Sequence, residues 1–235
     1  MKAHMFVLLT LAVLLASTLL CLHLVVQATV LAEQGLTFVI DAGHGGDDGG
    51  AVSEDGLMES TVNLAVAQRV DALLGLCGFE SVMTRSSEEV SYPAEADTIR
   101  KRKQADLEQR STLISAIPEA VLVSIHQNQY PSPGPHGVQV FYNDYDGSQA
   151  FAVYAQQLLL QGVGGSERSA ERISDSIYLM RKAECPAILV ECGFLSNPQE
   201  LALLKTDTYR TKLAVCIAAA CVGHAEELER LYGKG

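Results

Sequence analysis

Three ionisable side chains lie where buried strands are expected to end. His44 follows the apolar run Phe38–Asp41 in a glycine-rich turn, and His126 and Glu191 are the last residues of two further apolar runs. An apolar strand rarely ends in an ionisable residue without a partner, because burying a lone charge is costly. Ligands of open parallel sheets bind beyond the carboxyl ends of the strands. We therefore expect the three side chains to converge on one rim of a sheet.

Glu59 completes this group. It stands at the start of the first long helical pattern, directly after the loop that carries His44. Two imidazoles and a carboxylate around an open position are a known arrangement for catalytic zinc, which lowers the pKa of bound water to about 7. A second carboxylate can move the water's proton to a leaving group. We expect His44, Glu59 and His126 to bind Zn2+ and Glu191 to act as general base and acid.

Each of these residues also has a purely structural interpretation. A histidine in a glycine-rich turn can be a hydrogen-bonded loop residue, and Glu59 in the first turn of a helix favours the helix dipole. Glu191 can be a structural carboxylate paired with Arg181 or Arg85. The residues alone therefore predict a metal hydrolase and leave its substrate open.

Strand-like and helix-like patterns alternate along the chain. Val62, Val66, Val70 and Leu73 recur at helical spacing, and Gly78 ends that helix. Strands are expected over 38–41, 79–84, 121–126, 138–142, 177–180 and 187–191, and helices over 61–76, 98–116, 148–161 and, as a pair, 198–223. This alternation predicts an α/β fold with one domain, in which helices cover both faces of a mostly parallel sheet.

The N-terminal segment differs from the rest of the chain. Met5–Ala32 contains no Lys, Arg, Asp or Glu, and roughly 20 apolar residues suffice to span a bilayer as a helix. Lys2 precedes the run, which favours a cytoplasmic N-terminus and an exported remainder. The rival interpretation is a cleaved signal peptide, because Val30-Leu31-Ala32 resembles a cleavage site, although the run exceeds the usual core of about 7–15 residues.

We therefore favour an N-terminal transmembrane helix over 1–32 that anchors the protein in the cell membrane as a single-pass protein. One catalytic domain over 33–225 is then expected outside the cytoplasm, with a short charged tail over 226–235. Secretion after cleavage of the signal is the alternative.

Composition excludes some partners. The chain has 28 acidic and 17 basic side chains and a net charge of −11, which argues against nucleic acid and other anionic polymers. The six cysteines lack CxxC spacing, so neither a disulfide framework nor a zinc ribbon is expected, and we predict mostly buried free thiols. The arginine-rich helix Arg100–Arg110 is expected to be a solvated face with ion pairs to Asp106 and Glu108, and the alternative is that it reaches substrate carboxylates.

Four motifs resemble those of the zinc-dependent N-acetylmuramoyl-L-alanine amidases. They occur in the family's order, as Asp41–Ala51, Glu59 with Val62-Asn63-Leu64, Ser124–Asn128 and Glu191–Asn197. The resemblance extends from residue 37 to about 223 and implies hydrolysis of the amide bond between N-acetylmuramic acid and L-alanine in peptidoglycan. We expect Asp41, Asp48 and Asn128 to support the site, because zinc-bound histidines usually donate their other N–H to an acceptor.

Within this family the chain resembles the germination-specific, spore-cortex branch. The features are the short single-domain chain with an N-terminal anchor, Arg102-Lys103 leading into Asp106-Leu107 and Arg110, and Ile177–Met180. The resemblance implies removal of the peptide from muramic acid, after which a deacetylase completes the muramic lactam of the cortex.

The expected partners follow from this function and from the N-terminal segment. They are peptidoglycan as substrate and the membrane through the N-terminal helix, with an accessory activator protein as a further candidate. Two alternative functions are a zinc peptidase acting within the peptidoglycan stem and an inactive peptidoglycan-binding relative. The presence of all four site residues counts against the inactive relative.

Overall fold

The central sheet has six strands in the order β2-β1-β3-β6-β4-β5. The computed structural model describes residues 35–165 and 168–233. The strands are β1 (Thr37–Ala42), β2 (Glu80–Met83), β3 (Ala120–Asn128), β4 (Gln139–Tyr142), β5 (Glu171–Arg172) and β6 (Ala187–Phe194). Neighbouring strands are parallel except for β4, which is antiparallel to β6. The expected mostly parallel sheet is confirmed.

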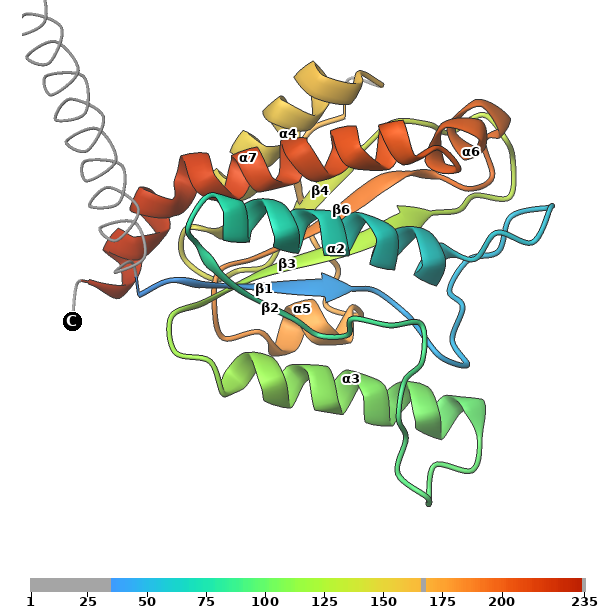
Figure 1. Ribbon diagram of the computed structural model, residues 1–235, viewed down its shortest axis with the longest axis horizontal. Helices are drawn as coiled ribbons and strands as arrows, with labels where there is room; N and C mark the ends of the chain where they lie inside the picture. Colours follow the sequence, from blue (N-terminus) through green and yellow to red (C-terminus); the bar gives the residue numbers. More distant parts are fainter. Residues whose placement is uncertain (1–34, 166–167, 234–235) are drawn as a thin grey trace, which may run out of the picture. The chain divides into compact units, whose positions relative to one another are not determined.

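Helices cover both faces of this sheet, as expected. They are α2 (Glu59–Leu76), α3 (Ile99–Ser115), α4 (Ser148–Val163), α5 (Tyr178–Lys182), α6 (Pro198–Leu204) and α7 (Asp207–Tyr232). Figure 1 shows α2, α4 and α7 on one side of the sheet and α3 and α5 on the other. Because α7 continues to Tyr232, residues 226–232 of the expected tail form its last turns.

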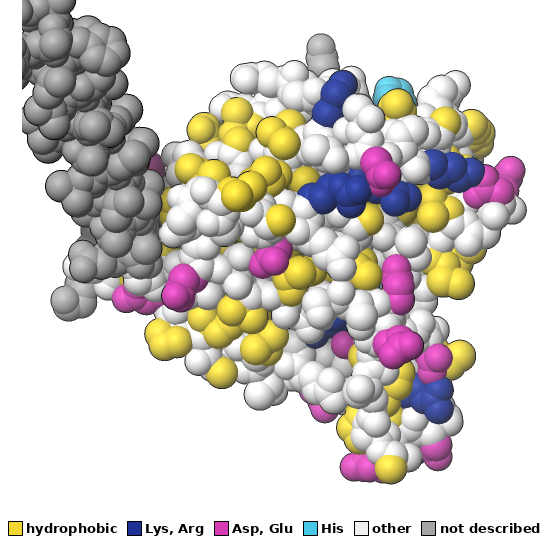
Figure 2. Space-filling view, viewed as in Figure 1, with side chains coloured by type: hydrophobic (Ala, Val, Ile, Leu, Met, Phe, Trp, Pro, Cys, Tyr) yellow, Lys and Arg dark blue, Asp and Glu magenta, His cyan; other side chains and the backbone are white. Residues whose placement is uncertain are grey.

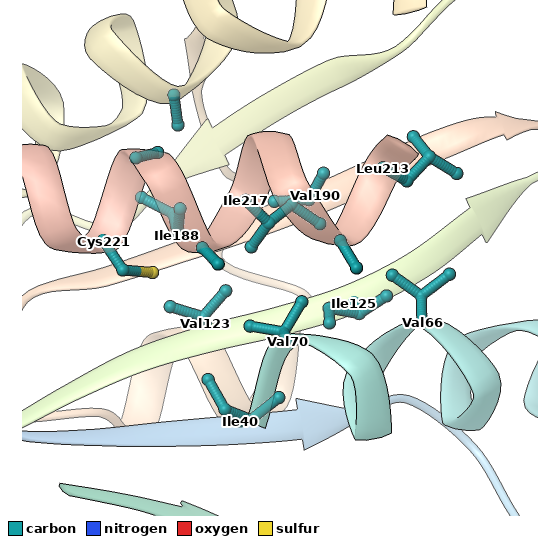
Figure 3. Packing of buried hydrophobic residues seen from close by; sticks show 14 of the residues in the cluster. Ile40, Val66, Val70, Val123, Ile125, Ile188, Val190, Leu213, Ile217 and Cys221 are labelled. Carbon is teal, nitrogen blue, oxygen red and sulfur yellow. The ribbon is translucent and has the colours of Figure 1, made fainter. Parts of the chain in front are cut away.

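The sheet face under α2, α4 and α7 carries the larger apolar core. Side chains alternate between the two faces along a strand, and this face receives Ile40, Val123 and Val190, all fully buried. They pack against Val70 of α2 and Ile217 of α7 (Figure 3). The face of the valine- and isoleucine-rich strands that lies under these helices is thus buried along its whole length.

The opposite face changes character along the strands. At its amino end Val39, Leu122 and Leu189 form a smaller apolar cluster, which includes residues of α3 and α5. Two residues further along the same strands, this face presents Asp41, Ser124 and Glu191. Apolar packing at one end of this face thus gives way to polar side chains at the carboxyl end.

Polar contacts fasten α2 to α7 at the surface. The Arg69 guanidinium of α2 donates to Asp207 at 2.8 Å and to Thr211 at 3.3 Å, both on α7. Figure 2 shows basic side chains gathered in a row where these two helices meet, with acidic side chains beside them. The two helices are therefore joined by their apolar faces and at their solvent edge.

The structure of the segment 177–180 differs from the predicted one. We expected a strand there, but Tyr178–Lys182 forms the short helix α5. Leu179 and Met180 are buried against the second face of the sheet from this helix. Four consecutive apolar residues show no period, so they cannot separate one turn of buried helix from a buried strand.

The cysteines within the described part of the chain are free thiols. Four of them are buried, including Cys216 and Cys221 on α7, and Cys77 is exposed. The expected buried free thiols are therefore confirmed for these four.

The predicted membrane anchor over 1–32 lies outside the described residues. Among the helices within residues 35–165 and 168–233, none is both long enough and apolar enough to cross a bilayer.

Candidate active site

His44, Glu59 and His126 meet at the carboxyl rim of the sheet. One donor atom from each residue lies within 4.8 Å of the other two. His44 Nε2 is 3.4 Å from Glu59 Oε2, and His126 Nδ1 is 2.9 Å from Glu59 Oε1. The three residues come from the loop after β1, the first position of α2 and the end of β3. Residues separated by up to 82 positions in the chain thus form one cluster.

The geometry of this cluster fits a small divalent ion. Zinc binds imidazole nitrogen and carboxylate oxygen tetrahedrally at about 2.0–2.2 Å, which places neighbouring ligand atoms about 3.4 Å apart. The two distances to Glu59, 2.9 and 3.4 Å, are close to that spacing. The two imidazole nitrogens and one carboxylate could therefore hold a metal ion and leave one position open.

Two glycines make room for these side chains. A Cβ atom on Gly43 would lie 2.3 Å from the His126 ring, and one on Gly50 would lie 2.6 Å from Glu59 Oε2. Gly50 also has a φ of +68°, which favours glycine. The glycine-rich loop after β1 therefore lets the backbone touch both other residues of the cluster.

Asp48 orients His44 within the same loop. Its Oδ2 lies 2.9 Å from His44 Nδ1 and 2.9 Å from Lys103 Nζ of α3. The hydrogen bond with His44 and the contact with Lys103 hold the pKa of Asp48 below its usual range. Nε2 of His44 is thereby left for the cluster, in the way that acceptors of the second N–H orient metal-binding histidines.

Glu59 is held by several donors as an ionised carboxylate. The backbone N–H groups of Ala51 and Gln127 donate to it at 2.9 and 3.1 Å, and Asn63 Nδ2 donates at 3.3 Å. Burial alone would raise the pKa of Glu59, but the hydrogen bond with His126 and both nearby histidines lower it to about 2. Glu59 is also an acidic residue in the first turn of α2. It therefore interacts favourably with the helix dipole and contacts both histidines as well.

Glu191 faces the cluster from β6. It is the direct neighbour of His126 across the β3–β6 ladder. Its buried Oε2 has no hydrogen-bond partner among the described residues, and no ion pair joins it to Arg181 or Arg85 there. Burial raises the pKa of Glu191 to about 7, opposed by His126 and reinforced by Glu59. A carboxyl that titrates near neutral pH is suited to accept and return a proton.

Arg110 contradicts the expectation that the arginines of this helix are solvated, whereas the expected ion pair with Asp106 is confirmed. Its side chain is 3% exposed and points into the protein. It donates to Asp41 Oδ1 at 2.8 Å, to Asp106 at 2.9 Å and to the carbonyl oxygen of His44 at 2.7 Å. Arg110 therefore fixes the backbone of the residue whose ring enters the cluster.

Arg85 supports the same loop from the other side. Its guanidinium donates to the carbonyl oxygens of Ala42, Gly43 and Ser60 at 2.9, 3.2 and 2.8 Å. Neither arginine was expected to have this role. The nearest signal was the buried Asp41 at a strand end, which needs a cationic partner.

Two of the three expected supporting residues do not contact the histidines by a hydrogen bond within the described residues. Asp41 accepts from Arg110, from Ser124 at 2.6 Å and from Thr84 at 2.8 Å. The Asn128 side chain accepts from the backbone N–H of Gln129. Of the three, only Asp48 contacts a histidine of the cluster directly, and Asp41 acts through the arginine.

The cluster opens into a cleft of about 450 Å³. One wall is the carboxyl end of the sheet with Ser124, His126 and Glu191, and the other is formed by α3 and by residues 173–180 before and within α5. The sheet wall presents convergent polar groups, and the opposite wall combines apolar side chains with the charged residues of α3, so the cleft can bind a substrate with both polar and apolar parts.

Known proteins are similar to this chain in both sequence and fold. Residues 38–222 match the N-acetylmuramoyl-L-alanine amidase family. The germination-specific N-acetylmuramoyl-L-alanine amidase of Bacillus subtilis is 40% identical over 188 residues, which cover 80% of this chain and 78% of that protein.

Solved structures agree with this match. The structure of the CwlD amidase from Clostridioides difficile in complex with the GerS lipoprotein superimposes with a TM-score of 0.78 at 31% identity, covering 82% of this chain and 99% of that one. The catalytic domain of CwlV from Bacillus (Paenibacillus) polymyxa var. colistinus gives 0.70 at 30% identity, covering 81% and 98%.

The cleft at the carboxyl rim, the family match over most of the chain and the similar amidase structures lead to the same assignment. The resemblance inferred from four motifs is confirmed, and the alternatives of a stem peptidase and an inactive relative are set aside. The chain belongs to the N-acetylmuramoyl-L-alanine amidase family and is an enzyme that acts on peptidoglycan.

Proposed function

We propose that the amidase reaction takes place at the cluster of His44, Glu59 and His126, with zinc as its metal and Glu191 as its proton carrier. One observation carries this proposal. One potential metal-ligand atom from each of these three residues lies within 4.8 Å of the other two, beside the carboxyl group of Glu191, whose pKa is raised to about 7. Zinc bound there supplies a Lewis acid and lowers the pKa of water to about 7.

The protein's own groups then have separate tasks. His44, Glu59 and His126 provide the ligands, and Asp48 keeps the His44 ring in place. Glu191 accepts a proton from the attacking water and passes it to the nitrogen of L-alanine as the C–N bond breaks. The water oxygen ends on the lactyl carbonyl carbon, which leaves a free lactyl carboxylate on the sugar and a free amine on the peptide.

A zinc-dependent digest with product identification tests this proposal. The full chain is incubated with purified peptidoglycan, with and without a chelator, and the products are identified by mass spectrometry. We expect an intact peptide with a free N-terminal alanine, no product after chelation, and recovery when zinc is added back. Activity that persists after complete removal of the metal would contradict the assignment of zinc.

We further propose that the chain acts in spore-cortex maturation. The support is its 40% identity with the Bacillus subtilis amidase described as germination-specific. A host that lacks the protein should make spores without muramic lactam, and the wild-type gene but not a Glu191→Gln gene should restore it. Normal lactam content in the deletion strain would contradict this role.

Location outside the cytoplasm is a separate proposal that rests on the apolar segment Met5–Ala32 and on Lys2 before it. N-terminal sequencing of the protein from its host distinguishes a retained anchor from a secreted protein, because cleavage would give a mature N-terminus at Glu33. Protease added to intact protoplasts of vegetative cells should degrade the catalytic domain. Full protection of that domain would exclude the proposed orientation.

An accessory partner is proposed from one neighbour. The similar CwlD amidase is described in complex with the GerS lipoprotein, and we infer that a lipoprotein of the host binds this chain and raises its activity. Turnover of muropeptides by the purified chain should then rise when that lipoprotein is added. An unchanged rate at saturating lipoprotein would argue against this partner.

A further inference from the structure

One side of α3 faces the cleft. Lys103, Asp106, Leu107 and Arg110 line it at positions i, i+3, i+4 and i+7 of the helix. Lys101, which is paired with Asp97, does not line the cleft. α3 therefore brings two cationic side chains to the wall opposite the sheet.

Arg110 and Lys103 differ in how many of their N–H donors are left without a partner in the described residues. The Arg110 guanidinium is 3% exposed, and the carboxylates and carbonyl oxygens that it holds use all three of its nitrogens. The Lys103 side chain is 48% exposed, and its Nζ contacts one carboxylate, Asp48, at 2.9 Å. Because an ammonium has three donors, two donors of Lys103 have no partner among the described residues.

The position of Lys103 relative to the reacting bond is set by a short chain of contacts. Lys103 Nζ lies 2.9 Å from Asp48 Oδ2, and the same oxygen lies 2.9 Å from His44 Nδ1. The His44 ring carries the donor Nε2 of the cluster on its other edge. One ion pair, one hydrogen bond and one imidazole ring thus separate the Lys103 ammonium from the place proposed for the chemistry.

The chemistry of the substrate decides which anion can reach this ammonium. In the uncleaved substrate the lactyl carboxyl group of the sugar is consumed in the scissile amide, so a free carboxylate near that bond belongs to the peptide. Consecutive Cα atoms are about 3.8 Å apart, so a carboxylate on the residue after L-alanine lies roughly 7 Å from the scissile nitrogen. This reach is comparable to the path from Lys103 to the cluster, which consists of two contacts of 2.9 Å and one imidazole ring.

We propose that Lys103 is a specificity-determining residue that binds a carboxylate on the peptide residue following L-alanine. The cleft holds this carboxylate while the scissile amide lies over His44, Glu59 and His126. The inference rests on the proposed function in placing the reaction at that cluster. An ammonium already paired with one carboxylate can bridge to a second, because its donors point in different directions.

The test compares two synthetic substrates. Both are N-acetylmuramoyl-L-alanyl peptides, and the residue after alanine carries a free carboxylate in one and the corresponding carboxamide in the other. We expect wild-type kcat/KM to be about tenfold higher for the acid, as a hydrogen bond to a charged group typically gives. Lys103→Met should remove this preference, Lys103→Arg should keep most of it, and the matched surface variant Lys101→Met should behave like the wild type.

A structural role of Lys103 predicts a different result. If the lysine acted only through Asp48 on His44, Lys103→Met would lower kcat/KM for both substrates by the same factor and leave the tenfold ratio intact. That outcome, or a wild-type enzyme that does not distinguish the substrates, would overturn the proposal.

A binding measurement separates this inference from the proposed function. The two product peptides, acid and carboxamide, are titrated calorimetrically into the full-length wild type, Lys103→Met and Lys101→Met. Tighter binding of the acid that is lost only in Lys103→Met supports the subsite even if hydrolysis fails. Equal affinities of the wild type for both peptides would exclude it whatever the enzyme hydrolyses.

Discussion

The two faces of one sheet have different tasks in this protein. The face under α2, α4 and α7 is apolar along its length, with Ile40, Val123 and Val190 among its buried side chains. The face toward α3 and α5 is apolar only at its amino end and carries Glu191 near its carboxyl end. The same strands build both faces, so their alternating side chains keep the stabilising contacts apart from the groups proposed to react.

This separation predicts which substitutions should affect the stability of the fold and which should affect catalysis. A change on the fully apolar face should lower the stability of the fold and leave the chemistry of the folded molecules intact. A change at the polar end of the other face should impair the chemistry and leave the fold largely unaffected. Four substitutions test this contrast.

The largest effect is expected from His44→Ala and His126→Ala. Each removes one of the three proposed zinc ligands, so tightly held zinc and turnover should both be lost, while the metal-free protein should unfold at nearly the wild-type temperature. Zinc content, activity and thermal unfolding check this. His136→Ala is the matched control, because His136 is exposed and lies outside the cleft. Full zinc stoichiometry in both ligand variants would refute the assignment of the site.

Glu191→Gln should have the next largest effect. The amide keeps the size of the side chain but cannot accept the water's proton, and general acid–base groups are typically worth about 10²–10⁴ in rate. We expect kcat to fall within that range while zinc remains bound. A loss of less than about tenfold would show that Glu191 is structural and that another group carries the proton.

Ile217→Ala tests the apolar face. Ile217 of α7 is 1% exposed and packs into the larger core, and such truncations cost about 2–5 kcal/mol. We expect denaturant unfolding to show a loss of this size, with kcat unchanged at temperatures where the variant is folded. Val215→Ala, on the same helix but 48% exposed, should change stability by less than about 0.5 kcal/mol. A strong fall of kcat in folded Ile217→Ala would break the contrast between the faces.

The smallest effect concerns pH. Burial raises the pKa of Glu191 from 4.5 to about 7 in the metal-free protein, so the folded state holds this proton more tightly than the unfolded state. The contribution of the proton to stability is complete below pH 4.5 and is lost as pH rises toward 7. The stability of metal-free wild type relative to Glu191→Gln should therefore fall across this window. A constant difference would indicate that the carboxyl is solvated.

Much of the fold could be predicted because its signals are local. The period of Val62, Val66 and Val70 marks α2, and the apolar runs that end in His126 and Glu191 mark the central strands. The site could be placed at the carboxyl rim because the carboxyl ends of parallel strands lie at the same edge of a sheet. The direction of β4 was not predicted, because the side-chain pattern of a buried strand is the same in both directions.

The remaining features depend on contacts that the sequence does not reveal. Arg110 stands among charged residues at spacings typical of a solvated helix, and its partner Asp41 lies 69 positions away. The short run at Ile177–Met180 has strand-like composition, yet the space beside the sheet accommodates a helical turn. In both cases tertiary packing decides between options that local preference leaves equal.

The place of β6 in the sheet has a consequence for the nascent chain. This strand is the last of the six to be synthesised, yet it lies between β3 and β4 near the middle of the sheet. Central parallel strands that pair over long sequence distances form late and slowly, because loop closure must precede their contacts. A growing polypeptide that has not yet reached residue 191 lacks the proposed proton carrier. A product truncated before residue 191 should therefore not hydrolyse peptidoglycan, although it contains His44, Glu59 and His126.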